Sequence, residues 1–291
     1  MSTHKFCRNV CLERGEPMPG AGGTAPRYVL LHWPRRHWRV PRTNAFDMPE
    51  ALSQAMITAN QAGIHVALVE GDEIALSCDN IILRTATTDI LTEQLLVLAS
   101  GGELCGERDE RITILCCTDG KQDPCCARYG FATWKALRDQ ADPTVFRVLQ
   151  STHIGGCRFA ASLLVLPQRA RYGRLEPKDV SDFLSCLSKG VPFLPAYRGN
   201  PELDALEQVA EHAALSFWND VGPQEKVVLE RKAGNTNEIE AEIIASTQSQ
   251  QLLIQLRLDQ FDVNTRCSTL EPDGDKDQVE RWSAVSIKPL A

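Results

Sequence analysis

The residues with the clearest chemistry in this chain are soft ligands gathered in two short segments. The first segment, residues 116–126, reads CCTDGKQDPCC, and the second, residues 153–157, reads HIGGC. Together they bring five cysteines and a histidine into one stretch of the chain. Thiolate and imidazole groups gathered in this way favour a thiophilic metal or an iron–sulfur cluster.

The composition is that of an ordinary globular protein. Of its 291 residues 43% are hydrophobic, and a net charge of −7 argues against general nucleic-acid binding. The chain has no apolar run long enough for a membrane-spanning helix, and its first residues lack the apolar core of a secretory signal. With eleven cysteines, we therefore expect a soluble protein of a reducing compartment, the cytoplasm, where clustered cysteines bind metal or act chemically.

Two stretches of the chain have the same predicted order of elements. Residues 27–101 read as strand, helix, three strands and helix. Residues 110–190 repeat that order, with the cysteine loop between their first strand and their first helix. A β-α-β unit followed by a hairpin and a helix is the core order of a thioredoxin-like fold. The apolar strands fit a sheet covered on both faces.

We therefore predict an α/β fold made of two tandem thioredoxin-like (β-α-β-β-β-α) halves and a small antiparallel β unit. The first half spans residues 1–105. The second spans residues 106–220, with the cysteine motifs and an amphipathic helix at 202–218. Residues 221–291 form the β-rich extension, whose alternation of apolar and polar residues is clearest at 252–258.

Strand geometry separates the adjacent cysteines of the first motif. If 112–117 is a strand, Cys116 and Cys117 point to opposite faces, so one faces the following loop while the other packs in the core. In the second motif, Gly155 and Gly156 let the backbone approach a ligand closely.

These motifs resemble those of the sucrase/ferredoxin-like family. The matching segments are CTDGKQDPCCA at 117–127, HIGGCRFAASLLVLP at 153–167, RYGRL at 171–175 and RGNPELDALEQVAE at 198–211, with FCRNV and GTAPRYVLL near the start. The resemblance covers roughly residues 5–218 and leaves the role of residues 222–291 open. It implies a thioredoxin-like ferredoxin domain that carries a [2Fe–2S] cluster.

The resemblance also implies the ligands, which are Cys117, Cys126, His153 and Cys157. The chain departs from the family at the last position, where the family usually has histidine. Cys116 and Cys125 stay open as alternative ligands. A third thiolate makes the cluster more negative, so the departure implies a lower reduction potential than in a two-histidine relative.

We therefore expect an electron carrier, rather than an enzyme, that works with a redox partner protein. One alternative is a Cys3His zinc site that stabilises an interaction module. Others are a thiol redox protein and a sucrose-cleaving hydrolase, for which the cysteine loop offers Asp119 and Asp123 as carboxylates.

Three further features have two readings each. Cys7 and Cys11 are a structural pair or a secondary redox pair. The basic segment 34–42, PRRHWRVPR, is a solvated loop or a docking surface for an acidic partner or nucleic acid. Arg128 and Arg158 lie beside the proposed cluster motifs, and they either balance the negative charge of a cluster or guide a partner, or they form surface salt bridges.

Overall fold

The computed structural model describes residues 5–71, 73–85, 87–218, 226–232, 239–271 and 274–290. They form two compact units. Unit 1 contains Met1–Gly23, Gly156–Ala160 and Arg169–Ala291, and unit 2 contains Thr24–Gly155 and Ala161–Gln168.

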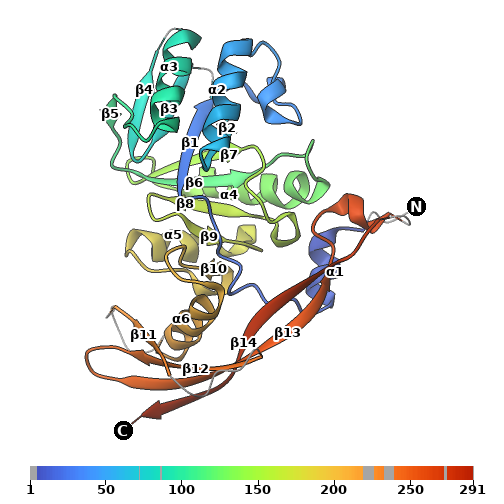
Figure 1. Cartoon of the computed structure of the whole chain (residues 1–291), viewed down its shortest axis with the longest axis vertical. Helices are drawn as coiled ribbons and strands as arrows, with labels where there is room; N and C mark the ends of the chain where they lie inside the picture. Colours follow the sequence, from blue (N-terminus) through green and yellow to red (C-terminus); the bar gives the residue numbers. More distant parts are fainter. Residues whose placement is uncertain are drawn as a thin grey trace. The chain divides into compact units, whose positions relative to one another are not determined.

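Unit 2 is built on a mixed sheet with the strand order β8-β6-β7-β2-β1-β3-β4-β5 (Figure 1). Its strands are β1 (Arg27–His32), β2 (Ile64–Val69), β3 (Ala75–Cys78), β4 (Ile81–Arg84), β5 (Glu107–Arg108), β6 (Ile112–Cys117), β7 (Phe146–Ser151) and β8 (Leu163–Leu166). Its α-helices are α2 (Glu50–Gln61), α3 (Thr88–Ala99) and α4 (Phe131–Gln140).

The pairing of these strands repeats between the two halves of the sheet. In the first half β1 and β2 are parallel, and β3 returns antiparallel to β1. In the second half β6 and β7 are parallel, and β8 returns antiparallel to β6. The expected α/β class and the tandem thioredoxin-like order are confirmed.

The two halves meet through the last residues of β2 and β7. Val69 pairs with Ser151 in an antiparallel bridge, and the flanking backbone adds a bond from the Thr152 amide to the Leu68 carbonyl, 2.8 Å long. Because both strands end at this bridge, the carboxyl ends of the two parallel pairs face a common junction.

The helices of the first half are amphipathic in the expected way. Leu52, Ala55, Met56 and Ala59 recur at helical spacing on α2, and each is at most 1% exposed. They pack with the buried leucines of α3 and the inward residues of β1 and β2 in one core. Burial of this stripe, more than helix propensity, stabilises α2 in place.

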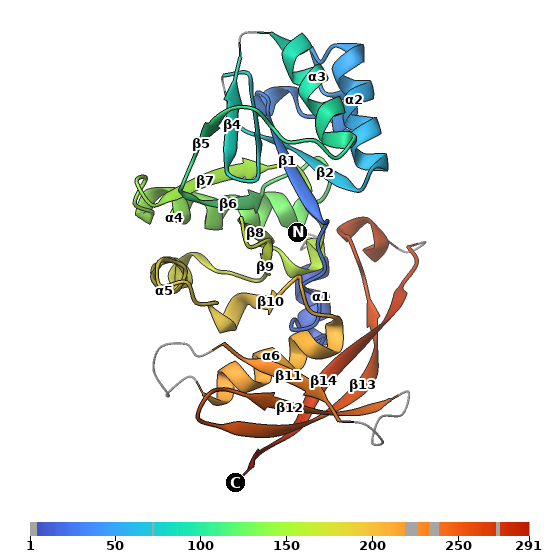
Figure 2. The ribbon, with the colours of Figure 1, turned by 60° about the vertical axis from the view of Figure 1, so that its left-hand side comes forward.

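Unit 1 contains the helices α1 (Cys7–Glu13), α5 (Val180–Ser188) and α6 (Ala205–Phe217), and the short strands β9 (Ala170–Tyr172) and β10 (Tyr197–Gly199). It ends in an antiparallel sheet, in the order β11 (Val228–Arg231), β12 (Glu240–Ser246), β13 (Gln251–Val263) and β14 (Asp277–Leu290). Figure 2 shows α6 lying along this sheet.

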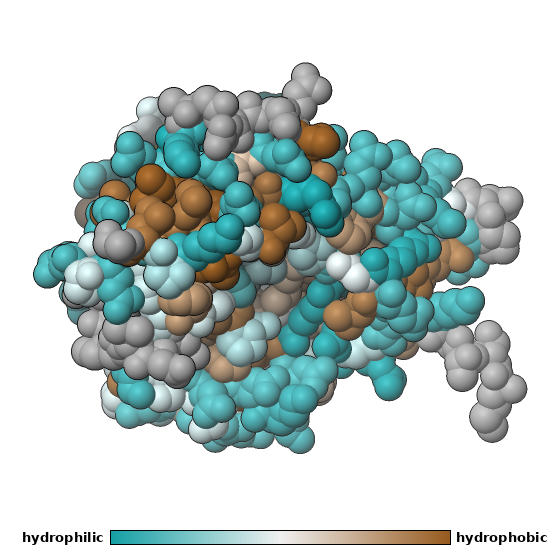
Figure 3. All heavy atoms as spheres, turned by 90° about the horizontal axis from the view of Figure 1, so that it is seen from below, coloured by the Kyte–Doolittle hydropathy of each residue, from teal (hydrophilic) through white to brown (hydrophobic). Residues whose placement is uncertain are grey.

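Helix α6 covers one face of the four-stranded sheet. A capping box starts the helix, since Asp204 accepts from the Glu207 amide at 3.0 Å and Glu207 accepts from the Asp204 amide at 3.2 Å. The apolar side of α6 packs against Leu252, Ile254 and Leu256 of β13. Their burial confirms the predicted alternation of apolar and polar residues at 252–258. Hydrophobic side chains also reach the surface, as Figure 3 shows for one face of the molecule.

Some predicted elements differ from the observed ones. The helix expected at 126–140 begins with a π-helical turn, η3 (Cys126–Gly130), before α4. Helix α1 was not foreseen, because its seven residues show no clear apolar period. The division into parts at residues 105 and 220 stays a prediction. No helix in the described ranges combines the length and apolarity needed to cross a membrane.

Gly130 is the last residue of η3 and precedes α4, in a tightly packed part of unit 2. A Cβ at Gly130 would lie 2.0 Å from the carbonyl oxygen of Cys117, a backbone atom that cannot move independently of β6. Alanine normally stabilises a helical glycine position by about 1 kcal/mol. Here we expect Gly130→Ala to lower the free energy of unfolding by about 3 kcal/mol, measured by denaturant titration.

The control is Gly23→Ala, because a Cβ at Gly23 has no atom within 4 Å and the glycine has no left-handed φ. This variant should change the free energy of unfolding by less than about 0.5 kcal/mol. Equal stability of the two variants would contradict the close contact at Gly130.

Candidate metal centre

The first motif lies at the end of a parallel strand pair in unit 2. Cys117 is the last residue of β6 and is in register with Ser151, the last residue of β7. The Thr118 amide donates to the Ser151 carbonyl at 3.1 Å, which extends the pairing by one residue. Parallel strands end at the same edge of a sheet, so the two segments that follow them emerge side by side.

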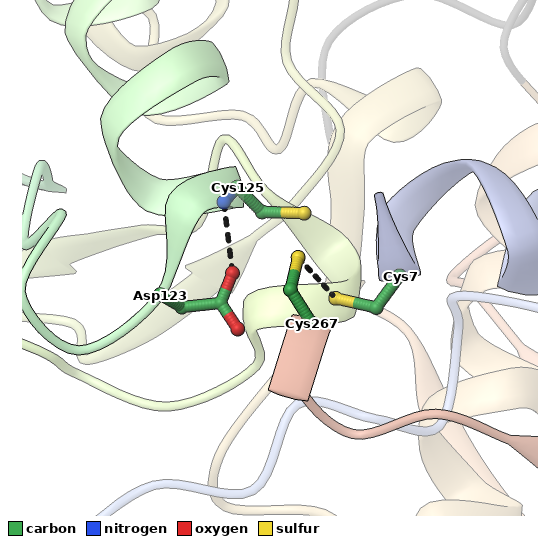
Figure 4. A group of neighbouring side chains, drawn as sticks. All are labelled: Cys7, Asp123, Cys125 and Cys267. Carbon is green, nitrogen blue, oxygen red and sulfur yellow. Dashed lines mark hydrogen bonds between the residues drawn. The ribbon is translucent and has the colours of Figure 1, made fainter. Parts of the chain in front are cut away.

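Two aspartates shape the loop that leads from Cys117 to Cys126. The Asp123 carboxylate accepts from the Cys125 amide at 2.8 Å (Figure 4), and the Asp123 carbonyl accepts from the Cys126 amide at 3.1 Å. The Asp119 carboxylate accepts from the His153 amide at 3.2 Å. Asp119 therefore ties the cysteine loop to the histidine of the second motif.

This arrangement brings three candidate ligands together. The sulfurs of Cys117 and Cys126 and a ring nitrogen of His153 all lie within 4.8 Å of one another. Both cysteines are 1% exposed, whereas His153 is half-buried. A compact group of two thiols and one imidazole, shielded on one side, suits a thiophilic metal or a cluster.

The surroundings of Cys117 favour its thiolate. Hydrogen bonds from the Cys126 and His153 side chains, helped by the electrostatic effect of His153 and by the Asp119 amide, lower the pKa of Cys117 to about 5 despite its burial. The thiolate is the form that binds metal. The metal-free chain therefore already holds one candidate ligand in its binding form at neutral pH.

The neighbouring cysteine, Cys116, faces the other side of β6. Its thiol donates to the Gly130 carbonyl at 3.3 Å, and burial raises the pKa of Cys116. The predicted opposition of Cys116 and Cys117 is therefore confirmed. Within the described residues, neither Cys116 nor Cys125 belongs to the donor group formed by Cys117, Cys126 and His153.

The basic segment at 34–42 supports the site from the first half of the sheet. Arg42 donates from Nη1 to the His153 carbonyl at 3.1 Å, and Lys121 of the cysteine loop donates to the Trp38 carbonyl. Trp38 is 2% exposed, and its indole donates to the Trp33 carbonyl at 3.0 Å. The sequence marked this segment as basic but carried no signal that Arg42 reaches His153, because that contact joins distant parts of the chain.

Cys157, the fourth predicted ligand, begins the short helix η4 (Cys157–Phe159) of unit 1. The preceding Gly156 has φ of 79°, a left-handed conformation that favours glycine. The Arg158 that follows donates to both carboxylate oxygens of Glu16, at 3.0 and 2.9 Å. That pair is buried, so Arg158 does not form the surface salt bridge that was one of its two readings.

Cys7 and Cys11 of α1 are both fully buried in unit 1, but they have different neighbours. The Cys11 thiol donates to the Asn264 carbonyl at 3.7 Å. Cys7 lies with its sulfur 3.7 Å from that of Cys267 (Figure 4). A sulfur close to that of Cys7 is therefore supplied by a cysteine that spacing along the sequence could not pair with it.

The pKa of Cys117 predicts a pH response of the metal-free chain. Because this pKa lies below the ordinary thiol value of 9.0, ionised Cys117 stabilises the fold fully above about pH 9. The contribution is lost as pH falls through about 5. Ultraviolet absorbance of the thiolate should show a transition near pH 5 that is missing in Cys117→Ser and retained in a control variant of the exposed Cys105, Cys105→Ser. A thiol transition only near pH 9 would contradict this account.

The chain is similar to a known family and, over part of its length, to solved structures. A thioredoxin-like [2Fe–2S] ferredoxin from Aquifex aeolicus is 20% identical, covers 31% of this chain and 91% of its own, and has a TM-score of 0.28. The wild-type crystal structure of the same ferredoxin at 1.5 Å resolution is 20% identical and covers 31% of this chain and 97% of its own, with a TM-score of 0.27. The comparison with curated proteins found no match. The sucrase/ferredoxin-like family model matches residues 20–199, more than half of the sequence, so the chain belongs to the sucrase/ferredoxin-like family.

Proposed function

We propose that the chain is an electron-transfer protein that carries a [2Fe–2S] cluster on Cys117, Cys126, His153 and Cys157. The observation that supports it most is the group of two sulfurs and one ring nitrogen within 4.8 Å, inside the part of the chain that matches the family. Cys157 completes the set in this proposal because it follows His153 in the second motif.

A bound cluster would supply one-electron chemistry, and the residues of the chain hold and shield it. Cys117 offers a thiolate at neutral pH, and the buried Cys126 restricts access of water. His153 contributes an imidazole whose backbone is held on both sides, by Asp119 at its amide and by Arg42 at its carbonyl. Backbone held in this way keeps a ligand in one orientation, which limits rearrangement when an electron arrives.

The hydrolase alternative has little support. A glycosidase needs two carboxyl groups across a sugar site. Asp119 and Asp123 are at most 5% exposed; Asp123 accepts from the Cys125 amide, and Asp119 accepts from the Gln122 and His153 amides. They act as structural acceptors and are not arranged around a substrate.

Zinc is the main alternative to a cluster at the same side chains, because three cysteines and one histidine also suit tetrahedral zinc. Zinc would make the site structural and redox-silent. The two possibilities differ in metal content, in sulfide content and in colour.

The proposal is tested by anaerobic purification followed by iron, sulfide and zinc analysis with visible and EPR spectra. We expect two irons and two sulfides per chain, a brown colour and a reduced-state EPR signal. Cys117→Ser and Cys126→Ser should each lose normal cluster loading, whereas Cys105→Ser, at an exposed cysteine, should load like the wild type. A colourless protein with one zinc per chain, or a full-strength cluster spectrum in Cys117→Ser, would overturn the proposal.

The cysteine at position 157 yields a separate prediction about potential. Replacing its thiolate by a neutral imidazole removes one negative charge from the ligand set, so Cys157→His should raise the reduction potential. A redox titration followed by EPR measures the shift. The control is the conservative Cys186→Ser on α5, outside both motifs. An unchanged potential in a cluster-loaded Cys157→His would show that Cys157 is not a ligand.

We further propose that the chain works in the cytoplasm with a redox partner protein. Its many cysteines suit a reducing compartment. Capture experiments with the cluster-loaded protein would identify the partner.

A further inference from the structure

Unit 1 buries several guanidinium groups around a single carboxylate. Glu16 is 1% exposed, and its carboxylate accepts from Arg158 and, at 3.1 Å, from Nη2 of Arg281. Arg174 donates to the Glu16 carbonyl at 3.2 Å. The Glu16 carboxylate therefore forms ion pairs with Arg158 and Arg281.

Arg198 lies in the same group, but within the described residues its side chain makes no hydrogen bond to Glu16. It is 6% exposed, and its guanidinium carbon lies 4.6 Å from the centre of the Phe159 ring. Arg158 and Arg174 lie over the same ring, at 4.7 and 5.2 Å. Nε and Nη1 of Arg198 are buried and have no hydrogen-bond partner among the residues that the structure describes.

This arrangement leaves a surplus of buried positive charge. Burial lowers the pKa of Arg198 well below its usual value, and the like charges of Arg171, Arg158 and Arg281 lower it further, while Glu16 opposes them. Stacking on an aromatic ring offsets part of the cost. Burying a cation without a matching anion remains unfavourable, so a negative charge nearby would stabilise this group.

The position of Arg198 indicates where that negative charge belongs. A Cβ on Gly156 would lie 2.8 Å from Nη1 of Arg198, so the guanidinium group rests directly against this glycine. Gly156 precedes Cys157 and, in its left-handed conformation, starts the turn η4 that carries it. The surplus charge therefore lies beside the backbone of a proposed ligand.

We propose that Arg198 is the countercharge of the cluster and raises its reduction potential. The inference rests on the proposed function, since it needs an anionic cluster with Cys157 as a ligand. Three thiolates and a neutral imidazole give the oxidised cluster one net negative charge, and reduction adds a second. A buried cation stabilises the more negative state more strongly, because Coulomb interactions are less screened away from water.

The test compares redox titrations of the cluster-loaded full chain for the wild type, Arg198→Met and Arg198→Lys. At the midpoint potential of the wild type, Arg198→Met should show a ratio of reduced to oxidised cluster about tenfold lower, which corresponds to about 59 mV for one electron. Arg198→Lys places a positive charge at the same position and should stay within about threefold of the wild type. The matched control is Arg257→Met, which removes an exposed arginine of the same unit and should leave the ratio unchanged.

The outcomes separate this inference from the proposed function. A wild-type protein without iron and sulfide refutes the proposed function and the inference with it. A wild type and Arg198→Met that both load the cluster and titrate at the same potential overturn the inference alone.

Loading itself is a second readout. If Arg198→Met does not hold a cluster while Arg198→Lys does, at a potential close to that of the wild type, the charge requirement is supported. If Arg198→Lys also fails to load, position 198 requires the shape of arginine, and the countercharge role is overturned.

Discussion

The candidate site depends on the parallel pairing of β6 with β7. This pairing places Cys117 opposite Ser151, so the loop to Cys126 and the segment to His153 start from the same edge of the sheet. A shift of the register by one residue would exchange the positions of Cys116 and Cys117. Cys116, whose thiol now donates to the Gly130 carbonyl, would then face the site. Cys117, which now forms a hydrogen bond with His153, would face the core.

The tandem arrangement explains why the first half contributes to the site without supplying a candidate ligand. Because β2 and β7 meet at their last residues, Val69 and Ser151, the carboxyl ends of both parallel pairs face one junction. The segment after β1 therefore approaches the segment after β7. In this way Arg42 holds the backbone of His153, and the buried Trp38 provides an acceptor for Lys121.

Both units bury charged groups, a negative thiolate in unit 2 and positive guanidinium groups in unit 1. In unit 2, hydrogen bonds from Cys126 and His153 favour the thiolate of Cys117. In unit 1, Glu16 neutralises part of a buried arginine group and leaves Arg198 without a carboxylate partner among the described residues. Buried charge is costly unless it is paired, so such groups are more often explained by function than by stability.

The sequence by itself determined the fold class and the family of this chain. Apolar runs, helical periods and turn residues act locally, which is why the tandem strand and helix order and the alternation at Leu252 and Ile254 could be read directly. The resemblance of the two motifs to the family likewise implied Cys117, Cys126 and His153 as ligands. These residues proved to be neighbours in space.

Tertiary structure decided the contacts between distant segments. The support of His153 by Arg42, the approach of Cys7 to Cys267 and the placement of Arg198 against Gly156 join residues far apart in the chain. A basic or cysteine residue looks the same in a sequence whether it faces water or a buried partner. Its surroundings, and with them its charge state, are set by packing that brings those segments together.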